Sequence, residues 1–418
     1  MAFYIFDNGS TLGPMEESEV VQGVHSRRFS ATAKACKVGD NEWRPLSEVV
    51  PLPNSSQFQW PQMPKIDASS VINGVAAKLT NLAGAETIEG LDGKRFFSEA
   101  FKKRSDDDLE QLFITGTAPT TPALSEINTD WPKPWAFFKA FIASVIVLAG
   151  FLYGWFHFQN PKLLPGLIFV GSFAIPFSTL ILFVELNVPR NVSLYQVFKL
   201  CAFGGIGSIL ISLFLYSAFD AENAWGSALA AGLFEEAAKI GAALVLMRNR
   251  RFHWTLNGLL IGAAIGTGFG AFESAGYALN SFFNDLGNAL NGSESNEMMW
   301  TMGIRALLAP AGHIAWTALA VAALWRVKAG KPFDWPMLKD PRFLRVYALV
   351  ATLHFLWDAP IAVPLLGDEL GLLAKYVLLG IAVWVLLLGY VQVGLKEIRL
   401  AQKESSPAPT ANSEIVAV

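Results

Sequence analysis

The sequence predicts an all-α polytopic membrane protein with about eight transmembrane helices and a small soluble α+β domain at its N-terminus. The 418 residues are 52% hydrophobic and only 16% charged, and their mean hydropathy is +0.37. These values exceed what the cores of a soluble enzyme require. Residues 1–133 are polar in character, whereas long apolar runs fill residues 134–396. Each run is close to the ~20 residues that cross a hydrocarbon core of ~30 Å.

Residues 1–50 are expected to fold as a separate small domain. They contain an alternating strand-like start, a Gly-Pro turn, a short amphipathic segment and Trp43 with Pro45 behind it. The stretches "YIFDNGSTLGPM" and "EWRPLSEV" resemble the bacterial GYF-like domains. That resemblance implies an aromatic surface that binds a proline-rich peptide in the polyproline II conformation. The equal alternative is that Tyr4, Phe6 and Trp43 simply form the small core.

Two further polar regions flank the apolar runs. Residues 51–133 are predicted to be a Pro-rich linker, a helical juxtamembrane part near "GKRFFSEAFKKRSDDDLEQLF" and a second linker, "TGTAPTTPALSEINTDWPKPW". Residues 397–418, which end in "ESSPAPTANSEIVAV", are expected to be a disordered tail.

Composition also excludes several classes of protein. The net charge is −3 and the sequence pI is about 6.0, so nothing indicates a nucleic-acid partner. Cys36 and Cys201 lie in regions of different character and support neither a disulfide framework nor a CxxC metal site. The first residues show no basic segment followed by an apolar run, so we expect no cleavable signal peptide.

Charge in the loops predicts how the chain crosses the membrane. Lys and Arg gather in alternate loops, whereas the loops "FDAEN" and "NSFFNDLGNALNGSESNEMM" contain neither. Because positively charged loops remain in the cytoplasm, we expect a multi-pass protein of the inner cell membrane with both termini in the cytoplasm. The eight runs are expected at residues 135–157, 162–184, 197–218, 225–247, 254–279, 300–325, 343–365 and 370–394.

Seven ionisable side chains lie deep inside four consecutive runs. An ionised side chain at the centre of a membrane helix costs roughly 2.5–3.5 kcal/mol, so each one calls for a reason. At ~1.5 Å rise per residue, six of the seven, all but Lys239, come between about halfway and two-thirds across from the cytoplasmic end of their run. We therefore expect them to converge on one site. They are Glu235, Glu236 and Lys239 in the fourth run, Glu273 in the fifth, His313 in the sixth, and His354 and Asp358 in the seventh.

Spacing within the runs predicts which of these side chains share a helix face. Glu235 and Lys239 are four residues apart and can pair, whereas Glu236 is rotated by about 100° and can face elsewhere. His354 and Asp358 are also four residues apart and can present an imidazole and a carboxylate together. The small residues of "GLLIGAAIGTGFGAFESAGYAL" allow neighbouring helices to pack closely around a polar cavity.

Three motifs follow one another on these runs: EExxK at Glu235–Lys239, FxxxE at Phe269–Glu273 and HxxxD at His354–Asp358. In this order they resemble the PrsW family of intramembrane proteases, as do "ELNVPRNVSLYQV" and "RALLAPAGH". That family is similar to the CAAX prenyl proteases and the bacteriocin-processing enzymes. The resemblance covers about residues 132–395. It implies a helical bundle with its site among the fourth to seventh spans, and hydrolysis of peptide bonds in membrane-anchored substrates such as anti-sigma factors.

The residue types suit this chemistry, because peptide hydrolysis needs a base that activates water, a group that stabilises the oxyanion and a proton for the leaving amine. We expect Glu235 to be the base, with Glu236 sharing its charge or orienting the water. Lys239 would stabilise this pair of carboxylates.

The remaining candidates would support the same reaction. His354 is expected to hold the water or the oxyanion, and Asp358 to orient its imidazole. Glu273 and His313 would complete the polar shell. For His313, which is alone on its run, a hydrogen-bonded packing role is an equal alternative. Glu185, at the cytoplasmic end of the second run, is expected to be an interfacial residue instead.

Other functions remain open at this point. Two Glu and two His match the ligand types of a catalytic zinc, but the motif HExxH is absent, so we expect no cofactor and keep a zinc protease as the alternative. A proton-coupled transporter would also need charged residues in the membrane. It would be expected to show inverted repeats, whereas the ionisable residues begin only in the fourth run. A purely structural ion pair between Glu235 and Lys239 would leave the other carboxylates without partners.

Overall fold

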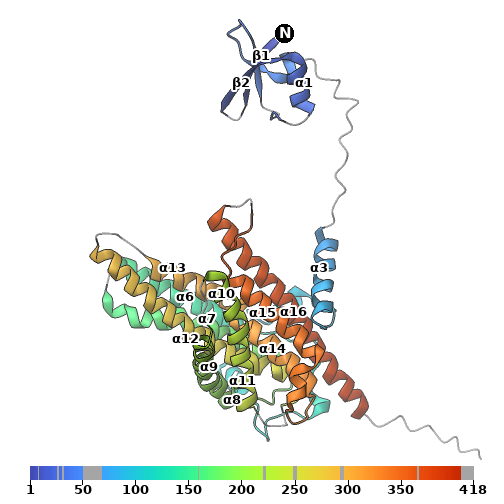
Figure 1. The fold of residues 1–418 in the computed structure, drawn as a ribbon. Helices are drawn as coiled ribbons and strands as arrows, with labels where there is room; N and C mark the ends of the chain where they lie inside the picture. The colour runs from blue at the N-terminus through green and yellow to red at the C-terminus, as the bar shows by residue number, and fades with distance from the viewer. Residues whose placement is uncertain are drawn as a thin grey trace, which may run out of the picture. The chain divides into compact units, whose positions relative to one another are not determined.

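The computed structural model divides the chain into two compact units, Met1–Val71 and Ile72–Val418. Figure 1 shows both units. Most of the expected Pro-rich linker and the last part of the expected tail lie outside the described residues. The described residues are 1–7, 9–25, 28–30, 33–49, 68–158, 160–219, 223–247, 252–291, 296–364 and 367–405.

The N-terminal unit is a four-stranded antiparallel sheet with two short helices. The sheet has the order β2-β1-β3-β4, and Phe3 of β1 pairs with Met15 of β2 and Lys37 of β3. Alternation along β1 buries Phe3 and Ile5. The elements are β1 Ala2–Asp7, β2 Ser10–Glu16, α1 Glu17–His25, β3 Lys34–Lys37, β4 Arg44–Pro45 and α2 Leu46–Val49.

Two of the three aromatic residues proposed for the core of this unit lie outside it. Phe6 is 43% exposed and Trp43 is 40% exposed, and their rings meet edge to face with centroids 6.0 Å apart. The core consists instead of Phe3, Ile5, Val20, Phe29, Ala33, Ala35 and Leu46. The core interpretation is therefore wrong for Phe6 and Trp43, and Tyr4 is half-buried. The resemblance to GYF-like domains stays a prediction.

The second unit begins with a juxtamembrane segment that is hydrogen-bonded to the last helix, α16 (Asp368–Ser405). Tyr390 of α16 donates a hydrogen bond to the carbonyl of Ala83, and Arg399 and Gln402 donate to carbonyls of residues 124–129. The segment predicted as a second linker is thus packed against a helix. Its elements are α3 Ala68–Leu82, α4 Gly93–Phe96, α5 Asp106–Phe113 and η1 Leu124–Glu126.

All eight predicted apolar runs are helical, which confirms the fold class. Figure 1 shows these helices gathered in one bundle. The long helices are α6 Ala136–Phe158, α7 Leu164–Leu186, α9 Gly205–Ser217, α11 Glu236–Leu246, α12 Thr255–Leu290, α13 Glu297–Leu308, α14 His313–Lys328 and α15 Pro341–Asp358. Shorter pieces complete them, namely η2 Pro161–Leu163, α8 Leu194–Lys199, η3 Leu200–Gly204, α10 Ala224–Ala230, η4 Ala231–Glu235, η5 Ala309–Ala311 and η6 Trp335–Lys339.

Six helices among the described residues are long and apolar enough to cross a membrane. They correspond to six of the eight predicted runs. The other two runs form the helices of residues 224–246 and 341–358, and each of these carries three charged residues. The number of membrane-spanning helices is therefore roughly that predicted. The two helices outside the six are the ones that carry Glu235 and His354.

Two details at the helix ends differ from the sequence predictions or extend them. Helix α16 continues to Ser405, so the prediction of a disordered tail is wrong for residues 397–405. Glu185, at the end of α7, accepts hydrogen bonds from the backbone N–H groups of Trp135, Ala136 and Phe137. A carboxylate at these free N–H groups stabilises the start of α6.

Helix α12 runs through the middle of the bundle and packs along α14. Glycine permits this close approach, since a Cβ on Gly262 would lie 2.3 Å from the carbonyl oxygen of Thr317, and one on Gly266 would lie 2.3 Å from that of His313. The prediction that small residues bring helices close is confirmed for this pair. The contact places Glu273 of α12 beside His313 of α14.

Candidate active site

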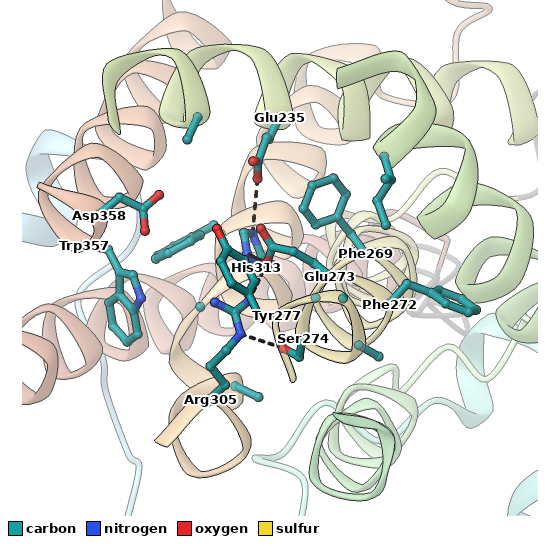
Figure 2. A pocket seen from close by; sticks show the side chains of 18 of the residues that line it. Glu235, Phe269, Phe272, Glu273, Ser274, Tyr277, Arg305, His313, Trp357 and Asp358 are labelled. Atoms are coloured by element: carbon teal, nitrogen blue, oxygen red, sulfur yellow. Dashed lines mark hydrogen bonds and ion pairs between the residues drawn. The ribbon is translucent and has the colours of Figure 1, made fainter. Parts of the chain in front are cut away.

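A cavity of about 1000 Å³ opens among helices α9, α10, α12, α13, α14 and α15. Four of the seven candidate residues line it: Glu235, Glu273, His313 and Asp358. Figure 2 shows Glu235 on one side of this cavity, with Glu273 and His313 near its middle. The other three candidates do not line the cavity and are buried next to those that do. They are Glu236, Lys239 and His354. The structure thus brings all seven residues together, as their depth in the sequence predicted.

Both carboxylates of the EExxK motif contact the same ammonium. Glu235 ends the π-helical segment η4, and Glu236 begins α11. The Nζ atom of Lys239 lies 3.5 Å from Oε2 of Glu235 and 2.8 Å from Oε1 of Glu236. The idea that Glu236 faces elsewhere is therefore wrong, because residues three apart on a helix are neighbours just as residues four apart are. Single π-helical turns often occur at functional sites.

Lys239 is fully buried, and its charge is matched on several sides. Besides Glu236, its Nζ atom lies 2.8 Å from Nδ1 of His313 and 3.8 Å from the ring centroid of Phe269. An ammonium taken out of water is costly unless it is paired and hydrogen-bonded. Phe269 is the first residue of the FxxxE motif, so this motif contributes a cation–π contact as well as a carboxylate.

His313 connects Lys239 to a second charged pair. Its Nε2 lies 2.9 Å from Oε2 of Glu273, and Arg305 of α13 donates a hydrogen bond to the same oxygen. The Nε atom of Arg305 also donates to Oγ of Ser274 at 2.9 Å. With Nε2–H donated to this carboxylate, Nδ1 is left as the acceptor for Lys239. His313 is therefore part of the charged network rather than a packing residue alone.

His354 is held on both ring nitrogens. Its Nδ1 lies 3.1 Å from Oε1 of Glu236, and its Nε2 lies 3.3 Å from Oδ2 of Asp358, as the HxxxD spacing predicted. The indole of Trp316 stacks on the imidazole with centroids 4.4 Å apart. These contacts fix the plane of the ring, so that Nε2 points toward the cavity side of the site.

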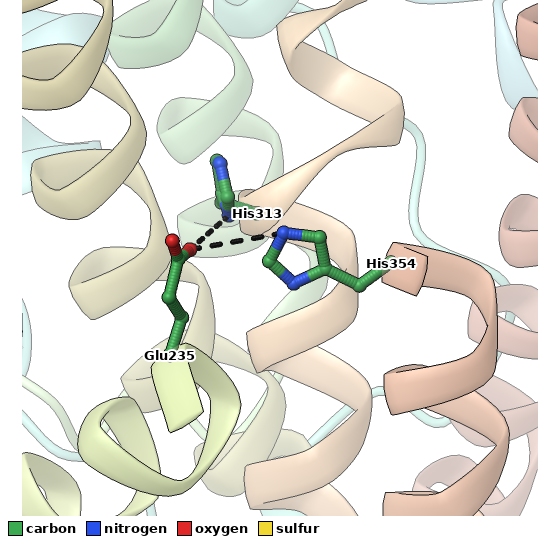
Figure 3. A group of neighbouring side chains, drawn as sticks. All are labelled: Glu235, His313 and His354. Carbon is green, nitrogen blue, oxygen red and sulfur yellow. Dashed lines mark ion pairs between the residues drawn. The ribbon is translucent and has the colours of Figure 1, made fainter. Parts of the chain in front are cut away.

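Glu235 lies where the two histidines meet. Its Oε2 is 3.9 Å from Nδ1 of His313 and 3.7 Å from Nε2 of His354. Figure 3 shows these two contacts as dashed lines. Its other oxygen, Oε1, accepts a hydrogen bond of 2.8 Å from the hydroxyl of Tyr216. Glu235 is thus the member of the glutamate pair that both borders the cavity and faces the imidazoles.

Glu235, His313 and His354 each offer a ligand atom, and these atoms lie within 4.8 Å of one another. A carboxylate and two imidazoles are ligands that zinc accepts. The surroundings fit less well, because the ammonium of Lys239 lies 2.8 Å from Nδ1 of His313 and repels a divalent cation. Glu273 on the other nitrogen of His313 is, by contrast, the kind of carboxylate partner that metal-ligating histidines have. The donor set therefore suits a metal by residue type and spacing, whereas the ammonium of Lys239 opposes one.

Sequence reasoning missed three residues of this site: Tyr216, Arg305 and Trp316. Arg305 had a usable signal, since it is a charge inside the sixth predicted run. Tyr216 and Trp316 had none, because aromatic residues are common at the ends and in the packed interior of membrane helices.

Comparison with known proteins agrees with this geometry. Residues 192–389 match the family described as PrsW family intramembrane metalloprotease, and this range contains all seven candidate residues. No curated protein and no solved structure shows a significant match. The matched range runs from α8 part of the way along α16 and contains the motifs EExxK, FxxxE and HxxxD. Residues 192–389 of this chain, an enzyme that spans the membrane several times, therefore belong to the PrsW family of intramembrane proteases.

Proposed function

We propose that this protease is an endopeptidase in which Glu235 is the general base. One observation carries the proposal: Glu235 is the carboxylate that borders the cavity and also faces both histidines. Glu236 is fully buried, and Lys239, His354 and the hydroxyl of Thr317 surround its two oxygens. A base must reach the water that attacks the substrate. Only Glu235 of this pair satisfies that requirement.

The spacing around Oε2 of Glu235 suits a water molecule as the nucleophile. Its distances of 3.7 and 3.9 Å to the two imidazoles are longer than direct hydrogen bonds and match groups that one water can bridge. In the proposed reaction, the water oxygen attacks the peptide carbonyl carbon while Glu235 takes its proton. Glu235 then gives this proton to the amide nitrogen as the C–N bond breaks.

The other residues prepare the site for this step. His354 faces the cavity through Nε2, whose N–H would be shared between Asp358 and the oxygen that becomes negative. Glu236 and Lys239 form a buried pair that fixes one side of the imidazole of His354 and supports Glu235. Glu273 and Arg305 hold His313. None of these roles requires a metal, so the reaction is proposed to need no cofactor.

The substrates are proposed to be proteins anchored in the membrane, with anti-sigma factors as one class. The cavity supports this, because it is bordered by helices that cross the membrane, and aromatic and small side chains line much of it. The exposed pair of Phe6 and Trp43 supports a proline-rich ligand for the N-terminal unit. The distribution of Lys and Arg supports an inner-membrane protein with both termini in the cytoplasm.

The proposal is tested by cleavage of a single-span membrane protein with purified enzyme in liposomes. We expect Glu235→Gln to lower kcat by about 10²- to 10⁴-fold, the contribution that general base catalysis typically makes. The isosteric change keeps the fold, which is checked by the thermal midpoint in detergent. Cleavage by Glu235→Gln at the wild-type rate would show that another group is the base.

The same assay addresses the zinc alternative, which the donor set of Glu235, His313 and His354 favours. Activity that is lost on chelation and restored by zinc would establish a metalloprotease. We expect chelators to leave the rate unchanged. The transporter alternative has lost its support, because residues 192–389 belong to a protease family.

A further inference from the structure

Tyr216, near the C-terminal end of α9, contacts the proposed base but has no assigned part in the reaction. Its hydroxyl donates a hydrogen bond of 2.8 Å to Oε1 of Glu235, and its side chain lines the cavity. We propose that Tyr216 is a positioning residue for peptide hydrolysis, which holds Oε1 of Glu235 so that Oε2 faces the two histidines. This inference rests on the proposed role of Glu235 as the base.

The two oxygens of Glu235 have different surroundings. Oε2 faces Lys239, His313 and His354 at 3.5–3.9 Å. Oε1 receives the hydroxyl of Tyr216, and no other side chain in the described part of the chain donates a hydrogen bond to it. The terminal torsion of a glutamate is broad and roughly two-fold, so the carboxylate plane is not fixed by its own chain. The hydrogen bond from Tyr216 supplies that constraint.

The contacts of Oε2 are too long to fix the orientation of the Glu235 carboxylate by themselves. None of its three neighbours is closer than 3.5 Å, so these contacts orient the carboxylate only weakly. The contact from Tyr216 is the one short hydrogen bond that Glu235 receives from the side chains that the structure describes. A rotated carboxylate would no longer place an oxygen between the two imidazoles. Glu235 would then be poorly oriented to take the proton of the attacking water.

A purely structural tie between α9 and the π-helical segment η4 is the competing explanation, and the chain offers a matched control for it. Tyr347 of α15 also donates a hydrogen bond of 2.8 Å to η4, but to the backbone carbonyl of Leu233. Tyr347 does not line the cavity. Tyr216→Phe and Tyr347→Phe therefore each remove one hydroxyl bound to the same segment. Only the first removes a contact to the carboxylate of Glu235.

We expect Tyr216→Phe to lower kcat about 10- to 100-fold with KM unchanged, the range set by a hydrogen bond to a charged group. The ring is kept, so its contact with Phe234 at 6.0 Å is preserved. Tyr347→Phe is expected to keep kcat within about twofold of wild type. Both are measured in liposomes with the same single-span substrate, and both thermal midpoints are recorded in detergent.

Two results would overturn the inference. The first is a kcat for Tyr216→Phe within twofold of wild type, and the second is an equal loss of kcat and thermal midpoint in both variants. Either result leaves Glu235 as the base untouched when Glu235→Gln is inactive. Conversely, an active Glu235→Gln removes the proposed function itself, so the two failures are distinguishable.

Discussion

The core around α12 and α14 and the outer cluster of α6, α7 and α13 are both built from apolar helices, but they differ in how they contain charge. The outer cluster packs residues such as Leu148, Leu167 and Met302 against one another. The charged side chains on its helices, Lys139, Glu185 and Arg305 among them, are exposed or half-buried. The core encloses Glu236, Lys239 and His354 at almost complete burial. Apolar packing alone makes helices associate, whereas the core also needs each charge to have a nearby partner. The core is therefore the more sensitive of the two regions to substitution.

The largest difference is expected from removing the central cation. Lys239→Met would leave Glu236 buried without its ammonium, and breaking such a pair typically costs about 3–5 kcal/mol. The thermal midpoint in detergent should fall strongly. The matched control is Lys139→Met on α6, where the exposed ammonium only contacts the ring of Trp135. Equal midpoints for the two variants would contradict the view that the core depends on paired charge.

A smaller difference is expected from packing. Gly262→Ala would place a methyl group 2.3 Å from the carbonyl oxygen of Thr317, so α12 and α14 would have to separate. Overpacking of this kind costs about 1–3 kcal/mol. The separation should also lower the rate of cleavage, because α12 and α14 carry Glu273 and His313. The measurement is the thermal midpoint together with kcat, and an unchanged kcat would show that the site tolerates movement of α12.

A next smaller effect is expected at the edge of the core. Arg305→Met should lower kcat about tenfold, because Glu273 would lose the donor that helps it hold His313. If Arg305 acts through Glu273, the same change in a Glu273→Gln background should add nothing further. The exposed Arg345→Met on α15 is the control. Additive losses in the double variant would mean that Arg305 acts on the substrate directly.

The smallest effect is expected in the outer cluster. A Cβ on Gly150 of α6 would meet no neighbouring atom within 4 Å. Gly150→Ala should therefore be neutral or slightly stabilising, since Ala in a helix is favoured over Gly by roughly 0.5–1 kcal/mol. A clearly lower thermal midpoint for Gly150→Ala would show that this face of α6 makes a contact beyond those in the structure.

Much of the core was predictable because charge in an apolar run is a strong signal. The cost of burying Glu235, Glu236, Lys239 and His354 made their convergence the simplest explanation. The contact of Glu236 with Lys239 was harder to foresee, since spacing rules allow two neighbouring carboxylates to face different ways. Which carboxylate borders the cavity depends on how the helices pack, and a single sequence does not contain that information.

The outer features were predicted less well, and the reasons are physical. Residues 397–405 are mostly good helix formers, so their helical state was open to prediction from propensity. Their packing was not, because Gln402 donates hydrogen bonds to carbonyls of residues 124–127. Tyr216 was indistinguishable from an ordinary aromatic residue at a helix end. In both cases the decisive partner is distant in sequence.

The attachment of the juxtamembrane segment to α16 sets the shortest chain that can keep the protease intact. Residues 192–389 match the family, but Tyr390, Arg399 and Gln402 lie beyond that range and bind carbonyls of residues 83–129. Glu185, which also lies outside it, holds the start of α6. Trimming the protein to the range that matches the family would therefore remove both sides of this attachment. A minimal active protease must extend from about residue 72 to the end of α16.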